Sequence, residues 1–152
     1  IRAREGANLA SRTINAEQAI MDSLAATAPP LDMRSNGMIH ITKILAVRSQ
    51  GASRNVVVAQ YRWRGGSYVP DKGVWNCGAA GGTYWDNTGN CAGLPPAAAA
   101  PSVDVMSGAL HDGDVVYLVE TFYRLPLFFG KMQLGGIVLP DFNPNLYAMT
   151  IF

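Results

Sequence analysis

The chain has 152 residues and a net charge of +1, with 49% hydrophobic and 15% charged residues. This length suits one domain, residues 1–152, and the hydrophobic fraction is too high for an intrinsically disordered chain. The near-neutral charge, without a basic stripe, argues against binding of nucleic acid or of an anionic membrane surface.

Residues 1–28 predict one long amphipathic helix. Their apolar side chains recur at spacings that fit a helical stripe better than a strand alternation. Pro29 and Pro30 end the pattern, because proline lacks the N–H that a helix needs. The larger residues of this stripe are Leu9, Ile14, Ile20 and Leu24.

Residues 38–63 predict a β-hairpin, with a small polar turn near residues 51–55. Alternation places Ile39 and Ile41 on one face of the first strand. In the second strand it places four residues on one face, namely Val57, Ala59, Tyr61 and Trp63. His40 lies in the middle of the first strand, where a histidine is more often a structural residue than a catalytic base.

Residues 65–101 predict a large irregular loop that is too long for an ordinary connection. Cys77 and Cys91 lie in it and could be unrelated thiols or a disulfide. The disulfide is favoured, because free cysteines are usually buried and these lie in loop-like sequence. It would close a loop of about 15 residues, contribute roughly 3 kcal/mol and indicate an oxidising compartment.

Three aromatic residues of this loop, Trp75, Tyr84 and Trp85, admit two interpretations. They could form an exposed surface that stacks on sugars or fills a partner's pocket. They could equally form a small satellite core beneath the disulfide loop.

Residues 114–152 predict the C-terminal strands. The strongest strand covers residues 114–125, with Glu120 and Arg124 four residues apart as an exposed pair, and a short strand follows at residues 146–152. The whole pattern predicts an α+β domain in which the N-terminal helix packs across an antiparallel sheet. An all-β sandwich is the weaker alternative, because residues 1–28 do not have a strand pattern.

Catalytic and metal-binding patterns are scarce. His40 and His111 are the two histidines, and the chain has neither Gly-x-Ser-x-Gly nor His-Glu-x-x-His. Residues 86–90 have oxygen ligands at alternating positions but one carboxylate, which favours an Asx turn over a calcium site. We expect no enzyme activity and no cofactor; a small hydrolase using His111 with Asp112 or Asp114 is a minor alternative.

Three stretches of the chain resemble the TadE-like minor pilin family. Residues 4–12 resemble the helix that follows the membrane segment, with an Arg-x-Gly-Ala pattern at Arg4 to Ala7. Residues 57–63 are similar to the strand after that helix. Residues 113–127 resemble the late strand, in which Gly-Asp introduces a valine-rich run that ends in Tyr and Pro. The last seven residues fit the final strand of the family.

The resemblance implies a pilin-like fold and a minor pilin or pseudopilin that helps to initiate or assemble a type IV-like (Tad) adhesive pilus. Its partners would be other pilin subunits and the inner-membrane assembly platform. The stripe Leu9, Ile14, Ile20 and Leu24 would contact neighbouring subunits. Such proteins face the periplasm or reach the pilus surface.

The membrane anchor that the resemblance implies is expected before Ile1, since the sequence contains no run of 18 apolar residues. A type II secretion pseudopilin would share the helix-on-sheet plan. The alternative function is an exported adhesin or carbohydrate-binding module that uses Trp75, Tyr84 and Trp85.

Overall fold

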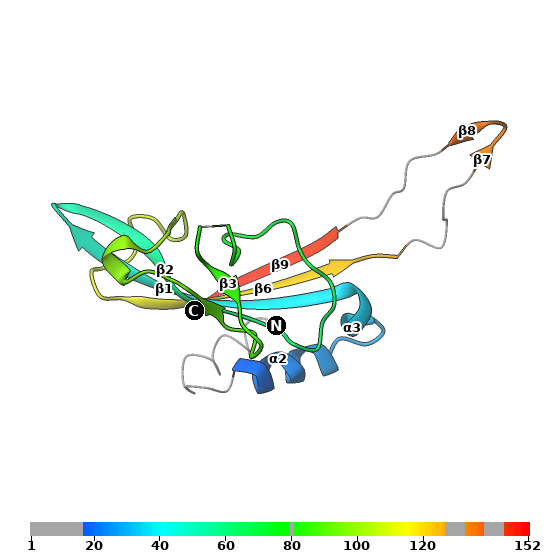
Figure 1. The fold of residues 1–152 in the computed structure, drawn as a ribbon, viewed down its shortest axis with the longest axis horizontal. Coiled ribbons are helices and arrows are strands. Elements are labelled where there is room, and N and C mark those ends of the chain that lie inside the picture. Colours follow the sequence, from blue (N-terminus) through cyan, green and yellow to red (C-terminus); the bar gives the residue numbers. More distant parts are fainter. Residues whose placement is uncertain (1–16, 80, 127–132, 139–144) are drawn as a thin grey trace.

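The computed structural model describes residues 17–79, 81–126, 133–138 and 145–152. Its centre is an antiparallel sheet with the strand order β5-β2-β1-β6-β9 (Figure 1). These strands are β1 (Gly37–Ser49), β2 (Ala52–Arg62), β5 (Ser102–Val103), β6 (Val115–Arg124) and β9 (Asn145–Ile151). The β1–β2 pair is the hairpin that the alternation predicts.

Smaller elements surround the sheet. Two short hairpins are formed by β3 (Tyr84–Trp85) with β4 (Cys91–Ala92) and by β7 (Gln133–Leu134) with β8 (Ile137–Val138). The helical elements are α2 (Glu17–Ala26), α3 (Met33–Asn36) and the 3-10 turn η1 (Ala97–Ala99). Within the described ranges, no helix has the length and apolar character needed to cross a bilayer.

The predicted α+β class, with a long N-terminal helix across the sheet, is wrong. In the described residues α2 has 10 residues and α3 has 4, whereas strands make up most of the regular structure around a curled sheet. Residues 1–16 of the predicted helix lie outside the described residues. The helical pattern is sound at residues 17–26, but this short element covers only part of one sheet face.

The α2 side of the sheet holds the first core cluster. Ile20 and Met21 are buried in the same cluster as Ile39 and Ile41 of β1. The indole N–H of Trp63, just after β2, donates to Asp22 Oδ1 at 2.7 Å and so fixes α2 against the strand end. Burial of these side chains, at about 1.5–3 kcal/mol each, is what holds so short a helix in place.

A β-bulge changes the predicted face of Val57. Lys43 pairs with Ala59 and Ile44 pairs with Val57, so Val58 is the extra residue in β2. A strand changes face with every residue, so one extra residue moves Val57 to the face opposite Ala59 and Tyr61. Val57 is fully buried there, in the second core cluster with Ile44 and Leu118.

The second face of the sheet is covered by residues 64–101, which we call the strap (green in Figure 1). Residues 37–42 of β1 are all buried, which requires cover on both faces of that strand. The irregular strap therefore forms a layer on the face opposite α2, which the sequence analysis had expected only as a surface loop.

Candidate functional site

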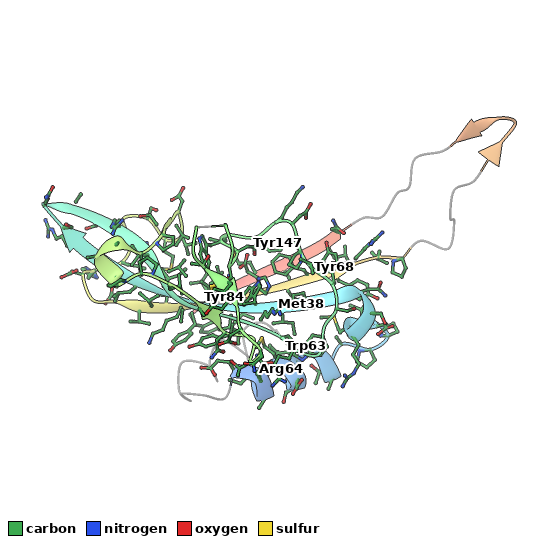
Figure 2. All side chains as sticks on the ribbon, in the orientation of Figure 1. Met38, Trp63, Arg64, Tyr68, Tyr84 and Tyr147 are labelled. Atoms are coloured by element: carbon green, nitrogen blue, oxygen red, sulfur yellow. A yellow bond between two sulfur atoms is a disulfide. The ribbon has the colours of Figure 1, made fainter. Side chains whose placement is uncertain are left out.

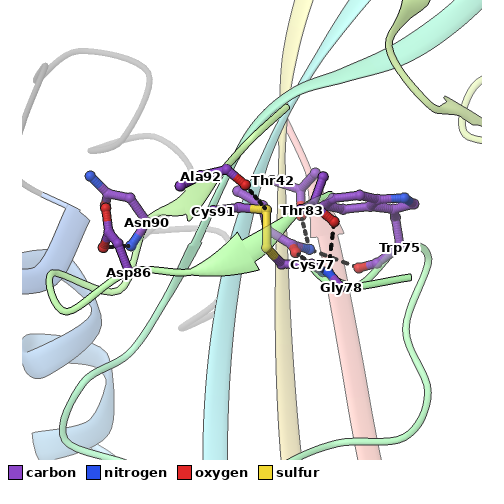
Figure 3. The surroundings of a disulfide bond; sticks show 10 residues. Thr42, Trp75, Cys77, Gly78, Thr83, Asp86, Asn90, Cys91 and Ala92 are labelled. Carbon is purple, nitrogen blue, oxygen red and sulfur yellow. Dashed lines mark hydrogen bonds between the residues drawn. A yellow bond between two sulfur atoms is a disulfide. The ribbon is translucent and has the colours of Figure 1, made fainter. Parts of the chain in front are cut away.

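The predicted disulfide is confirmed. Cys77 and Cys91 are bonded, with 5.7 Å between their Cα atoms (Figure 3). Cys91 lies in β4 opposite Trp85 of β3, so the bond joins this hairpin to the earlier part of the strap. Such a bond is typical of proteins that fold in an oxidising compartment.

A buried glutamine of β2 anchors the strap to the sheet. The side-chain amide of Gln60 donates to the carbonyl of Trp75 at 2.7 Å and to the hydroxyl of Thr42 at 2.9 Å. Its carbonyl oxygen accepts the N–H of Cys77 at 2.9 Å. This role was not predicted from the sequence; the available signal was an amide side chain within the mostly apolar run of residues 56–61.

Glu120 of β6 is a second buried anchor and not the exposed partner of Arg124 that the sequence analysis expected. The side chain is fully buried, while Arg124 is exposed. Glu120 Oε1 accepts a hydrogen bond from the N–H of Val74 at 2.8 Å and another from the hydroxyl of Tyr147 at 2.7 Å. Burial raises the pKa of the carboxyl group, against the opposing effect of these two hydrogen bonds.

Beside this anchor lies a pocket of about 400 Å³ between the strap and the β6–β9 part of the sheet. Tyr68 and Tyr147 both line it, and both are labelled in Figure 2. Phe122 and Leu146 add apolar surface, and Lys72 lines its strap side. Because Tyr147 is held by Glu120, the ring at this wall has a fixed orientation.

Of the three aromatic residues proposed as a binding surface, Tyr84 is the exposed one, at 61%. Trp85 is half-buried, with its ring 5.3 Å from that of His40 and 5.3 Å from the guanidinium carbon of Arg62. Trp75 is half-buried and packs against the second core cluster. The two tryptophans therefore help to hold the strap on the sheet.

The two histidines are in very different environments. His40 is buried between Trp85 and Phe122, and burial, followed by the nearby Arg62 charge, lowers its pKa to about 4. His111 is exposed at a turn, with its Nδ1 3.5 Å from Asp114 Oδ2. Asp112 accepts the backbone N–H of Arg48, so this carboxylate has a structural contact.

The turn at residues 86–90 uses its carboxylate internally. Asp86 Oδ1 accepts the backbone N–H groups of Thr88 at 2.8 Å and Asn90 at 3.0 Å, and also the Thr88 hydroxyl. These hydrogen bonds, first that of the Thr88 side chain, lower the pKa of Asp86. This is the Asx-type turn that the sequence analysis favoured.

The stripe proposed to bind neighbouring subunits is described only in part. Leu9 and Ile14 lie outside the described residues. Ile20 is buried in the first core cluster, and Leu24 is half-buried against it. These two side chains therefore contribute to the core of the domain.

The most distinctive surface of the described residues is the edge of β9 that faces away from β6. Tyr117 and Phe152 exchange two backbone hydrogen bonds, of 2.7 Å and 2.9 Å, and the β6–β9 register continues from them without a shift. In an antiparallel ladder alternate pairs are bonded in this way, so Ala148 and Thr150 direct their backbone groups toward β6. The residues whose backbone N–H and C=O groups point away from the sheet are Asn145, Tyr147, Met149 and Ile151.

The side chains of this edge are also unusual. Leu146, Tyr147 and Met149 are 45–49% exposed, and β9 contains no charged residue and no proline. Native proteins usually protect long strand edges with charges, prolines or bulges. Among the described residues, β9 pairs with β6 alone.

The opposite edge of the sheet is covered. β5 pairs with β2 at Asn55 and Val56. Next to this pair the carbonyl of Pro101 accepts the N–H of Val57, and at the far end the carbonyl of Gly89 accepts the N–H of Arg62. The strap and β5 thus cover one edge of the sheet, and the described residues leave the other edge available for a partner.

Comparisons with known proteins assign no family. No protein-family model, curated protein or solved structure matches the chain. In the ranges that the structure describes, no group of three or more His, Cys, Asp or Glu side chains is placed to hold a metal ion. Function is therefore inferred from the geometry of the β9 edge and from the sequence resemblance.

Proposed function

We propose that this chain is an extracytoplasmic assembly subunit, a minor subunit of a Tad-like adhesive pilus that works through protein–protein contacts. The observation that carries the proposal is the β9 edge, which among the described residues has no strand on its outer side and exposes the side chains of Leu146, Tyr147 and Met149. An exposed strand edge binds another chain by adding a strand to the sheet.

Two further observations support this function. The Cys77–Cys91 disulfide fits export to the periplasm or the cell surface. The stretch at residues 113–127 that resembles TadE-like proteins begins at the turn before β6 and includes all of β6, the strand that carries β9. The proposal does not need the pilin-like helix-on-sheet fold, and its partners are other pilus subunits and the inner-membrane assembly platform.

The competing function, glycan binding by an exported adhesin, has weaker support. It needs an exposed aromatic surface, and of its three rings Tyr84 is the one that is largely exposed. Trp85 and Trp75 are engaged with the sheet. A single exposed tyrosine offers little area for stacking on a sugar.

The test is genetic complementation in the source organism. Deletion of the gene is expected to abolish surface pili, and the wild-type gene should restore them. Met149→Lys places a charge on the open edge and should fail to restore pili. Val69→Lys is the matched control, because Val69 is a hydrophobic residue exposed at 77% on the strap; it should restore them fully. A deletion strain with a normal number of pili would contradict the proposed function.

A further inference from the structure

We propose that the β9 edge binds a second copy of this chain, with the two β9 strands antiparallel across a two-fold axis at Ala148. This inference deepens the proposed function, on which it rests, because it names the partner of the contact surface. The two sheets would join into one continuous sheet.

The choice of a second copy follows from the two edges of the sheet. A head-to-tail contact would place β9 of one copy on the β2 edge of the next. That edge is occupied by β5 and by the carbonyls of Pro101 and Gly89. Among the described residues, β9 is therefore the long edge that a second copy can offer, and pairing of identical edges gives a closed two-fold dimer.

The register follows from which backbone groups of β9 point away from β6. The outward-facing residues are Asn145, Tyr147, Met149 and Ile151, and full overlap of two antiparallel strands pairs Tyr147 with Met149 of the second copy. Asn145 then pairs with Ile151, and Ala148 faces its own equivalent at the axis. In this register every outward N–H and C=O of the strand finds a partner.

The side chains suit this arrangement. Because β9 is uncharged, its pairing with an identical strand brings no like charges together. The tyrosine ring and the thioether of the opposite methionine can form a sulfur–aromatic contact. The Tyr147 ring is already oriented by the hydrogen bond from its hydroxyl to Glu120, so little side-chain freedom is lost on association.

The experiment uses sedimentation of the purified chain from about 1 μM to about 1 mM, the range in which a single strand contact would be measurable. Wild type and Val69→Lys are expected to dimerise with equal affinity. Met149→Lys should weaken dimerisation about tenfold or more, because it places two ammonium groups in one interface. Circular dichroism of each variant establishes that it is folded.

A cysteine substitution tests the register. Across the proposed interface Ala148 faces its equivalent at a non-hydrogen-bonded position, where Cα atoms are about 4.5 Å apart and a disulfide can form. Ala148→Cys should therefore give a covalent dimer on mild oxidation, whereas Val69→Cys should not. Wild type that stays monomeric throughout overturns the inference, even if Met149→Lys abolishes pili, because the edge would then bind a different subunit. A dimer that Met149→Lys leaves intact also overturns it.

Discussion

Replacing both Cys77 and Cys91 with serine is expected to lower the free energy of unfolding by about 3 kcal/mol. The two cysteines are 14 residues apart, and their bond removes conformational freedom from the unfolded chain. In the folded state the same bond holds the β3–β4 hairpin close to the Cys77 N–H that Gln60 binds. Urea denaturation followed by circular dichroism measures the loss.

Reduction of the wild-type protein provides the control for this variant. Dithiothreitol should lower the stability of the wild type by a similar amount and leave the double serine variant unchanged. If the double variant were as stable as the wild type, the hydrogen bonds of Gln60 and Glu120 would be sufficient to hold the strap.

His40→Phe is expected to reduce the fall in the free energy of unfolding that occurs as the pH drops below 6.5. The pKa of His40 falls from 6.5 to about 4 on folding, chiefly because the side chain is buried. A histidine with a depressed folded pKa contributes stability that is fully present above pH 6.5 and is lost as the pH falls toward 4. The gap between the two pKa values corresponds to about 3 kcal/mol. Phenylalanine does not titrate and suits the contacts with Trp85 and Phe122.

Glu120 supplies the matched comparison for this pH experiment. Burial raises its folded pKa, so its contribution has the opposite sign: it is present below the unfolded pKa and is lost as the pH rises through the folded pKa. In the same urea series, Glu120→Gln should make the free energy of unfolding fall more steeply with decreasing pH, whereas His40→Phe should make it fall less steeply. If the free energy of unfolding of His40→Phe fell with decreasing pH as steeply as that of the wild type, a group other than His40 would cause the pH dependence.

The sequence alone predicts those features that depend on residues near one another along the chain. The strand alternation at residues 38–63 and 114–125 predicts β1, β2 and β6, and the cysteines in loop-like sequence predict the disulfide. The turn at Asp86 follows from residue types that bond their own backbone.

The remaining features depend on tertiary contacts that a single sequence does not display. The bulge at Val58 lies inside a regular valine run, so alternation alone misplaces Val57. Glu120 and Gln60 look like solvent-facing residues, but each binds the backbone of the strap. Glu120 accepts the N–H of Val74, 46 residues away in sequence, and Gln60 accepts the N–H of Cys77, 17 residues away. The N-terminal helix was wrongly predicted to be the main element packed on the sheet, because no local sequence signal shows that the irregular strap covers the second face.

The character of the β9 edge also depends on the assembled sheet. A short apolar C-terminal strand was expected, but its position at the edge depends on strand order. In the same order the strap and β5 lie along β2, whereas among the described residues β9 has β6 alone beside it. Edge position and the uncharged sequence together are the basis on which we propose a role in assembly.

The proposed contact between the β9 edges of two copies is best tested by cross-linking in cells. Ala148→Cys would be expressed at native level in the source organism and its products separated without reductant, with Val69→Cys as the control. We expect a disulfide-linked species of Ala148→Cys that contains a second copy of the chain and is absent from the control. A protein that remains monomeric in piliated cells, with its introduced thiol fully reactive, would contradict it.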